Sequence, residues 1–488
     1  MSRGRSGLGS GGAALGFAKL YFLFAGYAVV AALNQLLDKA TLGDYSAVAR
    51  LIAVPNMVII YTLMFSVSRP MAAEFERGSP SYDALRRRGF RMALVLGGLA
   101  SGVFFAGAPF FARLFSEPDL VGPIRVVAPI SLFYALYGVN VGTLNARRMF
   151  SRQAGLDVSM ATAKAGLIIA FTAMGLGLSG TLGGFTTASV LVLGLSVALV
   201  RAARPEASES RSQSEAPMAE LAGILIIYTA ATNLLLSVDL FVLKHFAIDE
   251  AAKRGVGFYS LAQYISQIPY SLLNAVSLLV FPLIATLHAQ GDAERVRAYV
   301  TQTAHVVFLL LGLMASVAVG ASPEILNLLF GRETAEYAAA DMRWMLVGYS
   351  GYSFVVTCGW IFNSAKRSRW AIALVGTGLG LSFAGGVGFV PTMGSSGAAY
   401  SVAVAGVSAT LVSIVALWKA FGVRLSPIFL FKLAAVVAAV VGTGLLWTVD
   451  GKLMALVKLT ALSLLFVAGA AGSRVVTLEQ IKALRRAA

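Results

Sequence analysis

Hydrophobic runs of about 20 residues follow one another along the chain from Ala13 almost to the C-terminus, and only short polar loops separate them. A run of this length is sufficient for an α-helix to cross a hydrocarbon core of roughly 30 Å. Hydropathy places about 14 such runs, centred near residues 23, 57, 102, 134, 168, 191, 231, 269, 310, 352, 380, 407, 437 and 461. The pattern predicts an all-α integral membrane protein.

One of these runs carries a polar face. In residues 259–282, YSLAQYISQIPYSLLNAVSLLVFP, polar side chains recur every three or four positions, which places them on one side of a helix. They are Tyr259, Gln263, Gln267, Tyr270 and Asn274. Such groups either join helices by hydrogen bonds or line a water-filled cavity, and five on one face favour the cavity. Pro269 removes a backbone donor and predicts a broken helix here.

A polar stretch divides the spans into two sets. Residues 201–220, RAARPEASESRSQSEAPMAE, have the composition of a cytoplasmic linker between six preceding spans and eight following ones. A shift of 214 residues matches the GxYS sequence at Gly43 to that at Gly257, and Pro55 to Pro269. We therefore predict two six-helix bundles in parallel repeat, residues 1–200 and 221–420. Residues 421–488 would add two transmembrane helices and a basic cytoplasmic tail.

The composition agrees with a membrane protein. The chain is 58% hydrophobic and 13% charged, whereas soluble domains contain about 25% charged residues. The net charge of +16 could indicate a nucleic-acid partner, but most of the 39 Lys and Arg residues fall in alternate loops. That placement follows the positive-inside rule, so we expect cytoplasmic N- and C-termini and no nucleic acid. The expected location is the bacterial inner (cytoplasmic) membrane.

Enzyme signatures are missing from the sequence. It contains no HExxH, CxxC or phosphate-binding loop, and its three histidines are scattered. Gly175, Gly177 and Gly180 satisfy GxGxxG, but without a preceding strand they indicate a glycine-lined helix end. A sugar-polymer polymerase or ligase would need a large loop outside the membrane, which makes this alternative less favoured. We expect no catalytic residue, metal or cofactor.

Ionisable groups at membrane depth are the remaining candidates for function, since each costs about 2.5 to 3.5 kcal/mol at a helix centre. Lys19 lies within the first predicted span and Arg50 in the outer part of the second. Both are candidates to bind an anion. Arg50 and Lys244 could equally extend to the interface, where their charge is solvated.

Two carboxylates at membrane depth have different expected partners. Asp157 and Lys164 are seven residues apart, so a structural ion pair along one helix face is the simplest interpretation. Asp239 has no basic residue three or four positions away. It is either the partner of a cation on another helix or a carboxylate that binds a proton or sodium.

Seven segments, taken in order, resemble the polysaccharide-export flippases, the Wzx-like branch of the multidrug/oligosaccharidyl-lipid/polysaccharide (MOP) exporter superfamily. In the first half they are LLDKATLGDYSAVA at residues 36–49 and APFFARLF at 108–115. In the second half they are SVDLFVLKHF at 237–246, GVGFYSLA at 255–262, FPLIATLHAQGD at 281–292, ASPEILNLLFG at 321–331 and GSSGAAYSVAVAG at 394–406.

The resemblance implies a flippase that moves a lipid-linked oligosaccharide of the undecaprenyl-diphosphate type by alternating access around a central cavity. The cavity would be lined by Lys19, Arg50, Asn56, Gln263, Gln267, Tyr270 and Asn274, with Asp239 coupling a proton or sodium ion to transport. A polysaccharide polymerase and a chain-length regulator are the expected partners, beside membrane lipids. The alternatives are a multidrug exporter and a lipid II flippase, although lipid II flippases usually concentrate arginines in their early spans.

Overall fold

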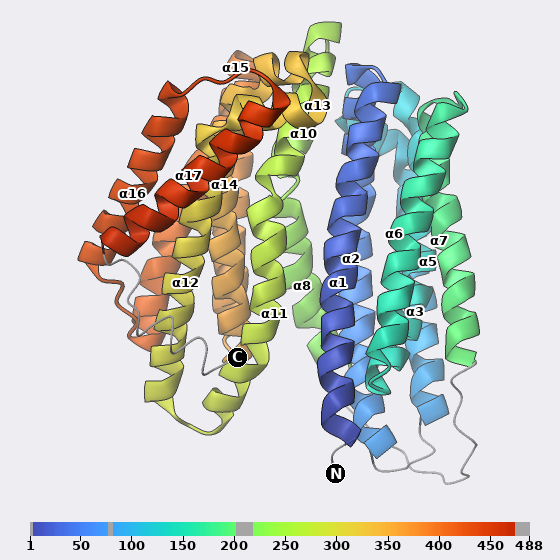
Figure 1. Cartoon of the computed structure of the whole chain (residues 1–488). Coiled ribbons are helices and arrows are strands. Elements are labelled where there is room, and N and C mark those ends of the chain that lie inside the picture. The colour runs from blue at the N-terminus through green and yellow to red at the C-terminus, as the bar shows by residue number, and fades with distance from the viewer. Residues whose placement is uncertain (1–2, 77–81, 202–217, 474–488) are drawn as a thin grey trace. The chain divides into compact units, whose positions relative to one another are not determined.

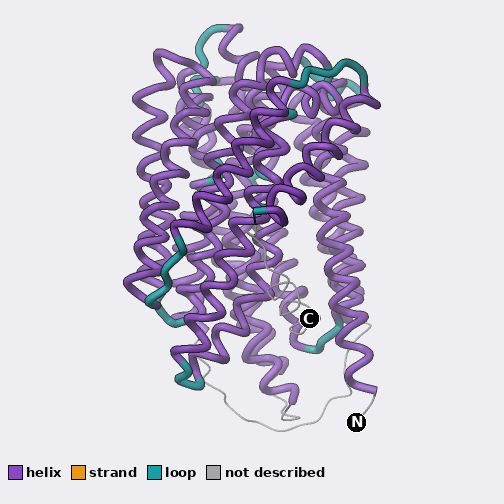
Figure 2. The backbone as a smooth tube through the Cα atoms, turned by 60° about the vertical axis from the view of Figure 1, so that its left-hand side comes forward, coloured by secondary structure: helices purple, strands orange, loops and turns teal. Residues whose placement is uncertain are grey.

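The computed structural model describes residues 3–76, 82–201 and 218–473, and within these ranges every regular element is a helix (Figures 1 and 2). Most of the predicted linker and the basic tail beyond residue 473 lie outside the described residues. In chain order the helices are α1 (Arg3–Leu36), α2 (Lys39–Glu76), α3 (Tyr82–Leu114), the 3-10 helix η1 (Pro118–Leu120), α4 (Val121–Val127), α5 (Ile130–Ala146), α6 (Phe150–Ala173), α7 (Gly177–Arg201), α8 (Met218–Leu235), α9 (Val238–Phe246), α10 (Glu250–Ser266), α11 (Ile268–Ala289), α12 (Ala293–Gly320), α13 (Ser322–Phe330), α14 (Arg332–Ser364), α15 (Ser368–Phe421), α16 (Pro427–Leu446) and α17 (Lys452–Gly472).

The all-α membrane fold is confirmed. In the described part of the chain, 11 helices are long and apolar enough to cross a membrane, and α8 with α9 forms a twelfth candidate bent by 51°. The 54 residues of α15 contain a non-helical residue, Gly394, and therefore cover two of the predicted runs. The run near residue 269 is divided between α10 and α11. The count of about 14 spans stays a prediction.

The chain divides into two compact units. Unit 1 consists of Met1–Ser237 with Lys244–Gly257, and unit 2 of Val238–Leu243 with Phe258–Ala488. This division assigns α8 to unit 1, although α8 follows the predicted linker in the sequence. The bundles at residues 1–200 and 221–420 stay a prediction.

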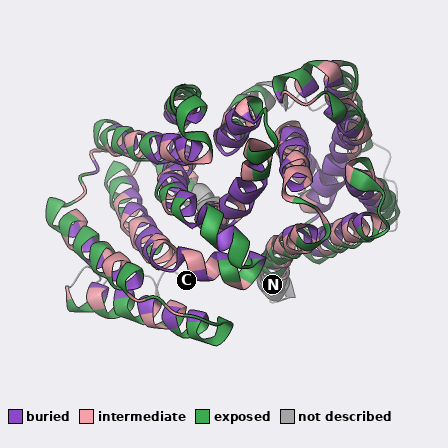
Figure 3. Cartoon of the chain, turned by 90° about the horizontal axis from the view of Figure 1, so that it is seen from above, coloured by how far each residue is buried: buried purple, intermediate pink, exposed green. Residues whose placement is uncertain are grey.

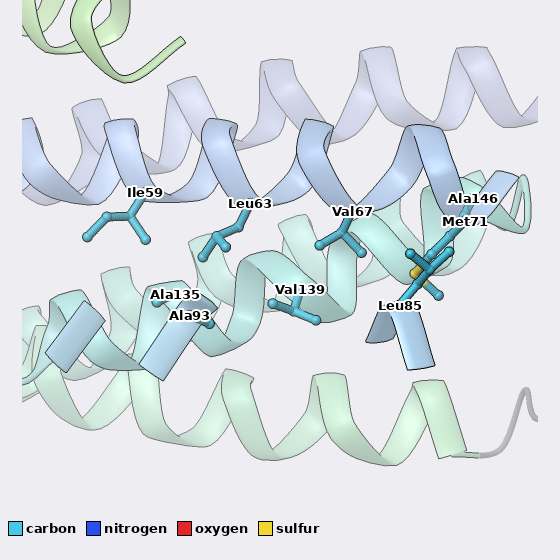
Figure 4. Close-up of a cluster of buried hydrophobic side chains, with 9 residues drawn as sticks. All are labelled: Ile59, Leu63, Val67, Met71, Leu85, Ala93, Ala135, Val139 and Ala146. Carbon is cyan, nitrogen blue, oxygen red and sulfur yellow. The ribbon is translucent and has the colours of Figure 1, made fainter. Parts of the chain in front are cut away.

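Close packing of small and branched side chains stabilises the helices within each unit. In unit 1, residues spaced by four along α2 face α3 and α5 in a buried cluster: Ile59, Leu63, Val67, Met71, Leu85, Ala93, Ala135, Val139 and Ala146 (Figure 4). A Cβ at Gly97 would lie 2.6 Å from the Cβ of Ala135, so α3 and α5 are nearly in backbone contact. Such close contacts stabilise helix association in a membrane, because the surrounding lipid is as apolar as the side chains and the hydrophobic effect contributes little. Many helices are buried on one side and exposed on the other (Figure 3).

Helices α16 and α17 pack within unit 2 through a similar close approach. The Cβ of a residue at Gly444 would lie 2.6 Å from the Cα of Gly320, so α16 and α12 cross at two glycines. Lys458 of α17 donates to Glu324 of α13 over 2.6 Å, and both side chains are buried. The ion pair supplies each buried charge with a counter-charge.

Candidate functional site

Asp239 is the centre of a buried polar cluster in unit 2. Its Oδ2 atom accepts hydrogen bonds from the hydroxyl of Tyr259 at 2.6 Å, the Nε2 of Gln263 at 2.8 Å and the hydroxyl of Tyr349 at 2.8 Å. Gln263 also donates to the Tyr349 hydroxyl over 2.7 Å. The side chain of Asp239 is fully buried. Helices α9, α10 and α14 therefore converge on one carboxylate.

Local chain geometry explains how this carboxylate reaches the interior. The helical run around residue 231 breaks after Leu235, and α9 begins at Val238, which puts Asp239 in a first helical turn. The N-terminal turn of a helix presents free N–H groups and favours a negative charge. The three donors named above are neutral side chains, so they can solvate either protonation state of the carboxyl group.

The polar face predicted for residues 259–274 crosses a short interruption. Helix α10 ends at Ser266 and α11 begins at Ile268, so the break expected near Pro269 is present, and the backbone N–H of Gln267 still donates to the carbonyl of Gln263 over 3.0 Å. Asn274 accepts from the indole Nε1 of Trp360 over 3.1 Å. Gln267 and Tyr270 are partly buried near the break. The face thus separates into two residues that bond Asp239 and three at or beyond the break.

In unit 1, Lys19 forms an ion pair that the sequence did not predict. Its Nζ lies 2.8 Å from the Oδ2 of Asp157, whose Oδ1 accepts from the Tyr137 hydroxyl over 3.3 Å. The expected pair between Asp157 and Lys164 is therefore wrong. Lys164 instead lies over the ring of Phe185, with its Nζ 3.9 Å from the ring centre. Asp157 therefore pairs with a lysine from another helix, Lys19 of α1, and not with the lysine nearest in sequence.

The two members of this ion pair differ sharply in exposure. The Lys19 side chain is 61% exposed and that of Asp157 is 12% exposed. The bond to Asp157 uses one of the three N–H donors of the ammonium group. Lys19 is thus held in place from one side by an anchored carboxylate while most of its side-chain surface stays exposed.

Arg50 and Asn56 are both placed on α2. Arg50 donates from Nη1 to the carbonyl of Leu236 over 3.2 Å, at the break between α8 and α9. It therefore satisfies a carbonyl that the break releases from the helical ladder. Asn56 is buried, and its Oδ1 accepts from the Ser131 hydroxyl over 3.0 Å.

Lys244 does not extend its charge into solvent, as one interpretation of the sequence suggested. Its side chain is 1% exposed; it is paired with Asp44 and lies 3.8 Å from Glu117. Lys253 lies 2.8 Å from the same Glu117 carboxylate. This hydrogen bond raises the pKa of Lys253 above its ordinary value. Sequence reasoning missed these ion pairs because the partners are far apart in the chain, and spacing rules apply only within one helix.

Comparison with known proteins bears on the fold. Two solved transporter structures have a similar fold. The inward-facing conformation of a multidrug resistance MATE family transporter has a TM-score of 0.65 at 13% identity, covering 83% of this chain and 94% of that one. A MOP superfamily transporter from Pyrococcus furiosus has a TM-score of 0.63 at 15% identity, covering 84% and 95%.

A family model identifies the chain more specifically than the shared fold does. The family model described as "Lipid II flippase MurJ" matches residues 91–467, which is more than half of the chain, so the chain belongs to the MurJ family. The structure titled "Lipid II flippase MurJ, inward closed conformation" has a TM-score of 0.71 at 13% identity and covers 94% of this chain and 98% of that one. No curated protein sequence matches. The chain is thus a multi-pass membrane protein of a flippase family, and the predicted superfamily is confirmed.

Proposed function

We propose that the chain translocates an undecaprenyl-diphosphate-linked saccharide across the cytoplasmic membrane of a bacterium by alternating access. The match of residues 91–467 to the lipid II flippase family carries this proposal. The chemistry of unit 1 supports it, because a diphosphate needs a cation along its path and Lys19 offers an exposed ammonium group.

Two cargoes of this class are candidates. The family favours lipid II. The ordered segments that resemble polysaccharide-export flippases favour the repeat unit of a polysaccharide, and the early spans hold only Lys19 and Arg50 where lipid II flippases usually concentrate arginines. We take lipid II as the first candidate, because the family match covers most of the chain. A polysaccharide cargo would bring a polymerase and a chain-length regulator as partners.

We assign the predicted cavity residues two roles. Lys19 and Arg50 would meet the diphosphate, since charge-assisted hydrogen bonds to phosphate are among the strongest a protein makes. Gln267, Tyr270 and Asn274 would bond the hydroxyl groups of the sugar, whereas Asn56 is buried beside Ser131 and would do so only after a rearrangement. Gln263 has a different task, because it bonds Asp239 and Tyr349 inside unit 2.

Asp239 is the proposed coupling group. A carboxylate whose three hydrogen-bond donors are neutral side chains can take up or release a proton or sodium ion without leaving a partner charge unpaired. Binding or release of the ion would alter the bonds that join α9, α10 and α14. Transport would then depend on a proton or sodium gradient.

Complementation distinguishes the two cargoes. Cells depleted of their own lipid II flippase would receive the chain, and separate cells lacking a polysaccharide repeat-unit flippase would receive it at the same abundance. Rescue of growth in the first strain supports lipid II, and rescue of polymer export in the second supports the repeat unit. Rescue of neither strain by a correctly inserted protein would contradict the proposal. Multidrug export would appear instead as raised resistance to toxic cations.

A further inference from the structure

Lys164 is a cation at membrane depth in unit 1 that the site described above does not use. It lies in α6, a helix long and apolar enough to cross a membrane. Its Nζ is 3.9 Å from the centre of the Phe185 ring on α7, and Phe185 is buried. Among the residues that the structure describes, no acidic side chain forms an ion pair with Lys164. Its partner there is the face of an aromatic ring.

The ammonium group of Lys164 lies against the packed interior of unit 1. Phe185 packs edge-on against Tyr134 of α5, with ring centres 6.0 Å apart, and Tyr134 is buried as well. A cation on the face of such a ring is therefore placed among α5, α6 and α7. The Lys164 side chain nevertheless keeps part of its surface exposed. The exposed part leaves the ammonium group open to a further partner.

An unpaired charge at this position is unfavourable for stability. An ionised lysine within a membrane span is costly, because the hydrocarbon core does not solvate it. The face of an aromatic ring offsets part of that cost, but less than a hydrogen-bonded anion would. Methionine would fill the same space without the penalty. We therefore expect the charge to serve a partner that binds and leaves, and the partner of a cation is an anion.

The position of Lys164 relative to Lys19 indicates which anion this is. Asp157, which holds Lys19, precedes Lys164 by seven residues on the same face of α6. Seven residues correspond to about 10 Å along a helix axis. The two phosphates of a diphosphate share an oxygen atom and lie much closer together than that. Lys164 is therefore placed for a different anionic group of the same cargo.

We propose that Lys164 binds a carboxylate of the saccharide head group while Lys19 binds the diphosphate, so that the chain selects a cargo with an acidic head group. Both candidate cargoes can carry such a group, lipid II on its peptide and a polysaccharide repeat unit on a uronic acid. The identity of the cargo rests on the proposed function, whereas the binding of a carboxylate at Lys164 does not.

Four ligands test the selection, with affinities measured by microscale thermophoresis in detergent. Two have no carboxylate: undecaprenyl diphosphate itself, and the same lipid carrying a neutral disaccharide. Two have one or more: lipid II, and the lipid carrying the same disaccharide with its terminal sugar as a uronic acid. The parent should bind at least one acidic ligand about tenfold more tightly than the neutral disaccharide ligand, because it gains a charge-assisted hydrogen bond. The acidic ligand that is preferred identifies the source of the carboxylate.

Lys164→Met should remove this preference. Affinity for the preferred acidic ligand should fall about tenfold, and affinity for the two ligands without a carboxylate should not change. Lys164→Arg is the conservative control, because arginine keeps the charge and also stacks on aromatic rings, so the preference should remain. Lys19→Ala should instead weaken all four ligands by a similar factor. Lys164→Met also removes an unpaired charge, so it should unfold at the same temperature as the parent or higher.

Glucuronate alone gives a test that needs no lipid-linked cargo. At matched ionic strength it should raise the thermal unfolding temperature of the parent and of Lys164→Arg, but not that of Lys164→Met, because a ligand stabilises only the protein that binds it. Glucose is the neutral control. Equal glucuronate shifts in the parent and Lys164→Met, or equal affinities of the parent for acidic and neutral lipid ligands, would overturn the inference. If the proposed function is wrong, the parent will bind none of the lipid ligands, yet glucuronate will still report whether Lys164 binds a carboxylate.

Discussion

At the scale of single residues, the account depends on which charges have partners and which stay accessible. Lys19 shows both conditions, because one carboxylate anchors an ammonium group whose side chain is still 61% exposed. Lys244 shows the opposite condition, since it is 1% exposed and fully engaged by acids. Only the first arrangement suits an anionic ligand that must bind and leave.

Lys19→Ala should weaken binding of undecaprenyl diphosphate to the purified protein by about tenfold, the loss expected for one charge-assisted hydrogen bond. Binding can be measured by microscale thermophoresis in detergent. Lys452→Ala removes an exposed lysine from the start of α17 and serves as the control. Equal affinities of the two variants would remove Lys19 from the binding site.

Asp157→Asn should act in the opposite direction. The amide cannot neutralise Lys19, but it can still accept from Tyr137. Loss of the competing negative charge should therefore tighten undecaprenyl diphosphate binding about threefold in the same assay. Weaker binding would mean that Asp157 positions Lys19 more than it competes with the ligand.

Asp239→Asn should remove the dependence of transport on an ion gradient. The side chain keeps its size, but it neither takes up a proton nor attracts sodium near neutral pH. Flipping in proteoliposomes should then proceed at one rate with or without an imposed pH or sodium gradient. Tyr349→Phe, which removes one donor and keeps the carboxylate, is the control. A normal gradient response in Asp239→Asn would exclude coupling at this residue.

At the scale of helices, the buried pair between α13 and α17 should stabilise the protein only as a pair. Glu324→Gln leaves the Lys458 charge buried without its counter-charge, which costs about 3 to 5 kcal/mol. Glu324→Leu combined with Lys458→Met removes both charges and should recover most of that loss. Thermal unfolding in detergent compares the variants. A double variant less stable than Glu324→Gln would contradict this argument.

The helical elements followed from sequence more readily than the contacts between them. Apolar runs predicted the spans, and Pro269 predicted the break between α10 and α11, because hydrophobicity and a missing backbone donor are local properties. The break between α8 and α9 at Leu236 was not predicted, because the sequence has no proline or glycine there. Tyr349, which contacts Asp239 from a position 110 residues away, gave no local signal either. The prediction that Asp157 pairs with Lys164 was wrong for the same reason, because its actual partner, Lys19, is distant in the chain.

At the scale of the whole molecule, the sequence repeat and the family match lead to the same kind of protein. The shift of 214 residues matches Gly43 to Gly257 and Pro55 to Pro269, whereas it matches Asp239 and Gln263 to Ala25 and Ala49. The glycine and proline positions thus recur in the sequence, and the polar groups around Asp239 mostly do not. Such a division suits a transporter with a symmetric scaffold and an asymmetric cargo.

The proposed activity is the movement of a lipid diphosphate-linked saccharide from one leaflet to the other. The direct measurement uses proteoliposomes containing fluorescent lipid II, with dithionite added outside to quench the label in the outer leaflet. The account predicts that the parent protein brings the protected inner-leaflet fluorescence out for quenching, and that Lys19→Ala does so several times more slowly. Quenching that stops at the outer-leaflet fraction with the parent, as in protein-free vesicles, both for lipid II and for an undecaprenyl-diphosphate-linked repeat unit, would contradict it.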